Sequence, residues 1–164
     1  MEVIAPWICD ACGKDIASVE DGWVEWLNRL DPVTRRVEGS YSNLRLVHHR
    51  QASPRASTKN ACYHDEDAYF AKYEATVADL PLDSFIGPDG LVLLLEFLSD
   101  KRFVEPEEVL ELIKRLHVPG YEQARPSFEA ALADGAYELN AKPRYLRQDQ
   151  LSYILAWRKA QEIE

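Results

Sequence analysis

The cysteines and histidines are the feature that most constrains how this chain can fold. All three cysteines and three of the four histidines lie in the first 64 residues, as Cys9-Asp10-Ala11-Cys12-Gly13, His48-His49 and Cys62-Tyr63-His64. A CxxC turn directs two thiolates at one ion, and tetrahedral zinc then needs two more ligands from distant parts of the chain. The pattern therefore predicts a structural zinc site that closes an N-terminal module and contributes to its folding free energy.

The fourth ligand is chosen by its position on a strand. Residues 43–49 alternate like a strand, with Leu44, Leu46 and His48 on the face that we expect to look at the core. That parity favours His48, while His49 on the opposite face and His64 close to Cys62 are the alternatives. The predicted metal ligands are Cys9, Cys12, His48 and Cys62.

The apolar periodicity changes along the chain and predicts a two-part α+β protein. Short strands are expected over residues 3–9, 23–27 and 43–49, followed by a helix over 65–78, so that a zinc-stapled β-rich module with one helix spans residues 1–80. The turn-rich segment 79–90 is expected to be a hinge. Beyond it, helical spacing predicts a four- or five-helix unit over residues 86–164; the number depends on whether Pro126 kinks a helix or starts a new one.

Composition and charge limit the classes of partner. A net charge of −9 argues against non-specific binding to nucleic acid or to membranes, and the longest apolar run, 91–95, is too short to span a bilayer. Residues 29–59 run against this trend, with seven basic side chains and two acidic ones. That stretch is either a solvated hairpin or a patch for nucleic acid or another acidic partner. The start shows no signal-peptide features, and three cysteines with a CxxC beside histidines suit metal binding better than disulfides, so we expect a cytoplasmic setting.

In treble-clef zinc fingers a CxxC turn, called the knuckle, is followed by strands and then by a ligand at the start of a helix. Residues 3–78 have this order and resemble that family. Treble clefs usually offer a second CxxC at the helix start, whereas here Cys62-Tyr63-His64 supplies a cysteine and a histidine two positions apart. The resemblance implies a structural zinc ion.

The same residues also resemble the pattern of HNH nucleases, which is a strand ending in His-His, a loop with asparagine and a later histidine. Carried over, His49 would be the general base, Asn60 would brace the loop, and His64, with His48, would hold a divalent metal. The spacings from His49 to Asn60 and from Asn60 to His64 are shorter than that family's. This alternative would place the basic 29–59 stretch against DNA.

Most of the chain is similar to a group of small uncharacterised bacterial proteins that share CxxCG, a WVEW-like strand, LVHH, Cys-Tyr and GPDGL. Four tryptophans and eight tyrosines favour a protein interface. The expected contact surfaces are the exposed face of the strand pair, with Arg45 and either Trp23 or Trp26, and the terminal helix. The function predicted is a small soluble zinc-binding interaction or regulatory protein, or a subunit of an assembly. A metal-dependent nuclease and a non-catalytic nucleic-acid binder are the alternatives.

Overall fold

The computed structural model describes residues 5–36, 39–55, 61–64, 66–142 and 144–163. The fold is mixed, with two small antiparallel sheets whose strands lie within residues 7–81 and with most of its helices after them, which confirms the predicted α+β class. The described chain divides into two compact units, which lie within residues 5–117 and residues 118–163.

A two-stranded sheet carries the CxxC turn. Strands β1 (Trp7–Ile8) and β2 (Asp15–Ile16) pair antiparallel, with Trp7 opposite Ile16. Between them the Gly13 amide donates to the Cys9 carbonyl at 2.9 Å, and Gly13 adopts φ = 73°. Only glycine reaches that left-handed conformation without a steric cost, so Gly13 lets the turn close directly after Cys12.

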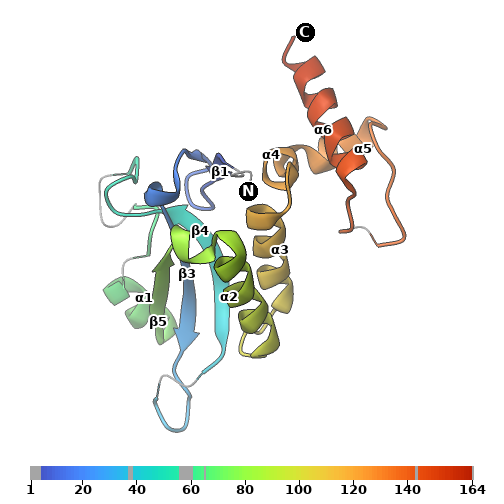
Figure 1. Ribbon diagram of the computed structural model, residues 1–164. Helices are drawn as coiled ribbons and strands as arrows, with labels where there is room; N and C mark the ends of the chain where they lie inside the picture. The colour runs from blue at the N-terminus through green and yellow to red at the C-terminus, as the bar shows by residue number, and fades with distance from the viewer. Residues whose placement is uncertain (1–4, 37–38, 56–60, 65, 143, 164) are drawn as a thin grey trace. The chain divides into compact units, whose positions relative to one another are not determined.

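The main sheet has three antiparallel strands in the order β4-β3-β5 (Figure 1). Its members are β3 (Gly22–Arg29), β4 (Tyr41–His48) and β5 (Ala75–Pro81). The central strand β3 is rich in tryptophan and valine, which favour pleated and half-buried positions. Its first residue, Gly22, lies opposite His48, so the register places the end of β4 beside the start of β3.

The outer edge of β4 is covered without a fourth regular strand. The Leu44 amide donates to the Glu108 carboxylate at 3.0 Å, and the Leu46 amide donates to the Asp10 carboxylate at 2.8 Å. The Leu46 carbonyl accepts the Asp10 amide, and Tyr41 exchanges backbone hydrogen bonds with residues 102–104. Side chains and irregular backbone thus satisfy the polar groups that an edge strand leaves open.

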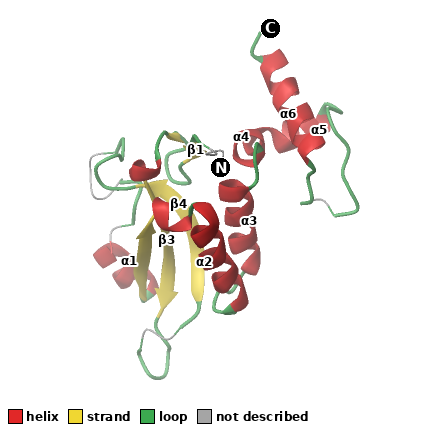
Figure 2. Ribbon diagram, viewed as in Figure 1, coloured by secondary structure: helices red, strands yellow, loops and turns green. Residues whose placement is uncertain are grey.

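Helices α2 (Gly87–Ser99) and α3 (Pro106–His117) run side by side beside this sheet (Figures 1 and 2). Trp26 of β3 contacts Phe97 of α2 with ring centroids 5.2 Å apart, and Leu94 and Leu112 are buried. Glu25, the preceding residue, points to the opposite face, where its carboxylate accepts the His64 amide. The sheet therefore separates an apolar core under α2 and α3 from a polar network on its other face.

The helix predicted over residues 65–78 is only partly correct. Helix α1 (Glu66–Tyr73) ends at Tyr73, Glu74 takes a left-handed φ of 51°, and the chain continues as β5. Val77 therefore pairs with Leu27 of β3 instead of lying on a helix face. The β-branched residues at 76 and 77 suit a strand, and the hydrogen bonds offered by β3 override the helical spacing.

The predicted boundary at residues 80–86 differs from the division that the structure shows. Helices α2 and α3 belong to the first compact unit, because they share one core with the sheet. The segment interpreted as a hinge includes a short 3-10 helix, Leu82–Phe85, whose Leu82 and Phe85 are fully buried. Its turn-forming residues are therefore part of a packed corner.

The second unit contains helices and connecting loops, with no strand among its described residues. Its helices are α4 (Tyr121–Ala124), a 3-10 turn over Arg125–Ser127, α5 (Phe128–Ala133) and α6 (Gln148–Gln161). Pro126 lies in the 3-10 turn, so the helix predicted over 121–134 is interrupted there. A small core of its own holds the unit together, with Tyr121, Ala131, Leu151 and Ile154 buried.

Candidate metal centre

Four residues from three separate segments meet at one end of the first unit. Cys9 and Cys12 come from the turn between β1 and β2, His48 is the last residue of β4, and Cys62 lies in the loop before α1. Their ligand atoms all lie within 4.8 Å of one another. Sulfur ligands about 2.3 Å from a tetrahedral zinc ion are about 3.8 Å apart. Small side-chain adjustments would therefore let this cluster hold a metal ion.

A hydrogen bond made by one ring nitrogen of His48 orients the other ring nitrogen toward the cysteines. The Nε2 atom lies 3.0 Å from the Asp15 carbonyl oxygen, and the Nδ1 atom lies 3.5 Å from the Cys12 sulfur. A hydrogen bond to a carbonyl requires the proton on Nε2, which leaves the Nδ1 lone pair directed at the cluster. A backbone carbonyl that sets the tautomer in this way is the usual support of a metal-binding imidazole. His48 is only 5% exposed, so this geometry is shielded from water.

The thiols of Cys62 and Cys12 have pKa values shifted in opposite directions. Burial, reinforced by the neighbouring Cys9, raises the pKa of the Cys62 thiol to about 11. Burial alone would also raise the pKa of Cys12, but hydrogen bonds from the Lys14 backbone and the neighbouring thiols lower it overall. Because thiolates bind metal and thiols do not, a metal ion would have to displace the Cys62 proton.

A buried ion pair supports the Cys62 segment from the polar face of the sheet. The Arg45 guanidinium donates to the Glu25 carboxylate at 2.7 Å, to the Cys62 carbonyl at 2.9 Å and to the His64 ring at 2.8 Å. Glu25 is 1% exposed, and burial raises the pKa of its carboxyl while Arg45 opposes the shift. Arg45 therefore connects β3 to the loop that carries the last cysteine.

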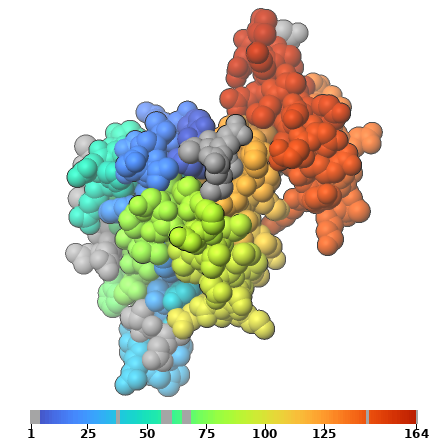
Figure 3. Space-filling model, viewed as in Figure 1, coloured from blue at the N-terminus to red at the C-terminus, as the bar shows by residue number. Residues whose placement is uncertain are grey.

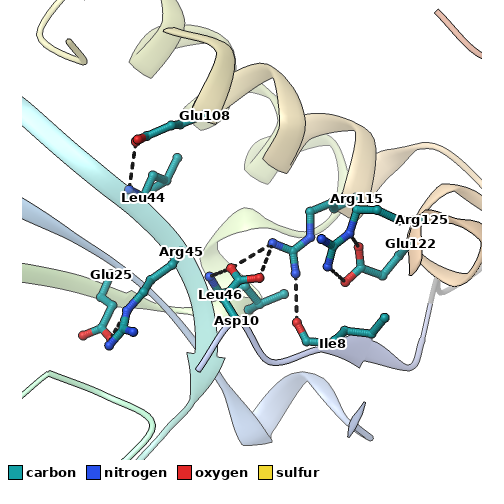
Figure 4. A network of polar contacts seen from close by, with 10 residues as sticks. All are labelled: Ile8, Asp10, Glu25, Leu44, Arg45, Leu46, Glu108, Arg115, Glu122 and Arg125. Atoms are coloured by element: carbon teal, nitrogen blue, oxygen red, sulfur yellow. Dashed lines mark hydrogen bonds and ion pairs between the residues drawn. The ribbon is translucent and has the colours of Figure 1, made fainter. Parts of the chain in front are cut away.

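A second ion pair supports the CxxC turn from α3 (Figure 4). The Asp10 carboxylate accepts two contacts from Arg115 Nη1, at 2.9 and 3.0 Å, and Arg115 Nη2 donates to the Ile8 carbonyl at 2.8 Å. Sequence reasoning missed the roles of Asp10, Glu25 and Arg115. Asp10 stands between the two cysteines of the CxxC turn, and its partner Arg115 lies 105 positions away in the sequence.

The two alternative fourth ligands are engaged elsewhere. The His64 Nδ1 atom accepts the Arg45 N–H, so the ring sits beside a positive charge that would repel a metal cation. Burial and that guanidinium lower the pKa of His64 to about 3. The His49 Nδ1 atom accepts the Gln51 amide at 2.9 Å, and its ring lies 5.9 Å from that of Trp23. Of the three candidate histidines, the structure brings His48 to the cysteines.

The residues of the nuclease-like pattern are dispersed. His48 belongs to the cysteine cluster, His64 is held by Arg45, and Asn60 lies outside the described residues. The basic 29–59 stretch is also partly neutralised, because Arg45 pairs with Glu25 and Arg35 pairs with Glu74 at 3.2 Å. These arginines are less available to a phosphate backbone than the sequence indicates.

Comparison of the chain with protein-family models, with curated proteins and with solved structures gave no match. Among the described helices, none has the length and apolar character required to cross a membrane.

Proposed function

We propose that this chain is a non-catalytic zinc-binding interaction protein in which zinc has a structural role. The observation that carries the proposal is the cluster of Cys9, Cys12, His48 and Cys62. Three sulfurs and one imidazole match the ligand set of structural zinc sites, and four protein ligands fill a tetrahedral ion. Catalytic zinc keeps one position for water or substrate, which this set would not provide.

The surrounding architecture supports a treble-clef-like module. The knuckle between β1 and β2 supplies two ligands, the β3–β4 hairpin delivers His48, and Cys62 comes shortly before α1. The cysteines form no disulfide. Thiols that must remain reduced to bind metal suit a reducing compartment, so we place the protein in the cytoplasm.

Helix α2 supports the interaction role. Pro88, Val92 and Leu95 recur at four- and three-residue spacing and share its outer face, where Val92 is 56% and Leu95 is 48% exposed. The surface of this helix, yellow-green in Figure 3, faces the viewer. An apolar stripe on a helix that already buries its opposite face is typical of a protein-binding surface.

Metal analysis of adjacent histidine variants tests the zinc assignment. The wild-type protein should hold one zinc ion per chain by elemental analysis after purification without added metal. His48→Ala should lose that zinc, while His49→Ala, one residue along the same chain, should retain it. Retention of full zinc in His48→Ala would contradict the assignment. Magnesium- or manganese-dependent nicking of plasmid by the wild type that His49→Ala abolishes would favour the nuclease instead.

The interaction role is tested by photo-crosslinking in cells. A benzoylphenylalanine placed at Leu95 should form a discrete adduct with a protein partner. The same group at Val33, which is 87% exposed but far from α2 in the sequence, serves as the matched control. Equal labelling from both positions, or none from Leu95, would remove the support that α2 lends to this role.

A further inference from the structure

Arg115 contacts the residues on both sides of Cys9, one of the four residues of the proposed zinc site. Its Nη2 group donates to the carbonyl of Ile8, the residue before Cys9, and its Nη1 group contacts the carboxylate of Asp10, the residue after it. Figure 4 shows the guanidinium reaching from α3 to both groups. The contacts are between 2.8 and 3.0 Å, so the position of Cys9 is tied to the last turn of α3.

Asp10 extends the same connection to β4. Its Oδ2 atom accepts the Leu46 amide at 2.8 Å, and its own amide donates to the Leu46 carbonyl at 2.8 Å. Leu46 lies two residues before His48 on the same strand face, so Asp10 relates the Cys9 end of the cluster to the His48 end. One carboxylate thus joins the knuckle, the strand and the helix.

The arginine depends on the knuckle as much as the knuckle depends on it. Arg115 is 5% exposed, and a buried guanidinium without its partners is strongly disfavoured. If the knuckle moves when the metal leaves, Arg115 loses its acceptors on either side of Cys9. The last turn of α3, from which Arg115 extends, is then no longer tied to the knuckle. The chain leaves α3 at His117, directly before Val118-Pro119-Gly120.

We infer that Asp10 and Arg115 are positioning residues that couple metal occupancy to the docking of the last turn of α3. The inference rests on the proposed zinc site and deepens it, since it makes the order of this helix end responsive to the metal. Coupling of this kind is reciprocal: whatever zinc contributes to docking of the helix end, docking contributes to zinc affinity by the same factor. Breaking the contact should therefore weaken metal binding although no ligand is changed.

The test compares zinc affinity in variants of two similar contacts. Asp10→Asn keeps an acceptor for the Leu46 amide but removes the charge that Arg115 meets. Glu108→Gln is the matched control, because Glu108 joins the same helix to the same strand through the Leu44 amide, away from the cysteines. Competition with a chromogenic chelator should show zinc binding about 10- to 100-fold weaker in Asp10→Asn. Glu108→Gln should remain near the wild-type value.

Hydrogen exchange supplies the second measurement. With zinc bound, Asp10→Asn should speed amide exchange in the last turn of α3, whereas Glu108→Gln should speed it in the first turn. If Asp10→Asn proves poorly folded, Arg115→Lys gives the same comparison while retaining a charge. Unchanged zinc affinity in these variants, or equal weakening in Glu108→Gln, would overturn the coupling. A wild type that binds no zinc would instead refute the proposed function itself.

Discussion

The buried pair of Glu25 and Arg45 allows a quantitative prediction. Glu25→Leu removes a carboxylate that accepts Arg45 at 2.7 Å and the His64 amide at 3.1 Å, from a position that is 1% exposed. Loss of one partner of a buried pair costs about 3 to 5 kcal/mol. The Arg45 side chain is 22% exposed and still donates to the Cys62 carbonyl, so it keeps part of its solvation. We therefore expect a loss near the lower end, about 3 kcal/mol in the free energy of unfolding.

A double-mutant cycle separates this cost from the loss of packing. Arg45→Met removes the stranded charge, so Glu25→Leu/Arg45→Met should be more stable than the sum of the two single losses predicts. The coupling energy should be about 1 to 3 kcal/mol. Urea unfolding with excess zinc measures all four proteins under one condition, and the zinc content of each shows whether Cys62 stays in place. If the two single losses of unfolding free energy add up to the loss in the double variant, Glu25 does not stabilise the fold chiefly by compensating the charge of Arg45.

Three further outcomes follow from local geometry. A Cβ at Gly90 would collide with the Phe85 carbonyl group, so Gly90→Ala should lower the free energy of unfolding, measured in urea, by about 3 kcal/mol. A Cβ at Gly135 would meet open space but would strain the backbone at φ = 76°, so Gly135→Ala should lower it by only about 1 kcal/mol. Because the pKa of His64 is lowered to about 3, its ring should remain neutral in the folded protein at pH 5, as nitrogen NMR can check. The unfolded chain would bind that proton, so the contribution of His64 to stability is complete above about pH 6.5 and decreases below it. The raised pKa of Cys62 requires proton release on metal binding, so apparent zinc affinity should rise roughly tenfold per pH unit for each proton displaced, and a pH-independent affinity would contradict this.

The candidate site could be predicted from sequence to the extent that its chemistry is local. The CxxC spacing identifies two thiols, and strand parity selects His48 because Leu46 and His48 share a buried face. Burial alone would not have distinguished the two strand faces, because Val47 on the other face is also fully buried. The hydrogen bond to the Asp15 carbonyl, which sets the His48 tautomer, had no sequence signal at all.

The misplaced elements were decided by contacts between distant residues. The predicted helix over 65–78 includes Val77, but pairing with β3 makes this residue part of a strand. The hinge interpretation of residues 79–90 rested on turn-forming residues, and it could not foresee that Phe85 would be buried in the core. Arg115 resembled an ordinary basic residue in the last turn of a helix, and only the folded chain brings it to Asp10.

The covered edge of β4 has a consequence for how these molecules behave at high concentration. A bare strand edge is a template on which a neighbouring molecule can add its own strand and begin to aggregate. Here the amides of Leu44 and Leu46 already donate to carboxylates of the same chain. An approaching strand would have to displace those two carboxylates from amides that they already occupy. Asp10 and Glu108, which connect the knuckle and α3 to β4, thus also prevent another strand from pairing with this edge of the sheet.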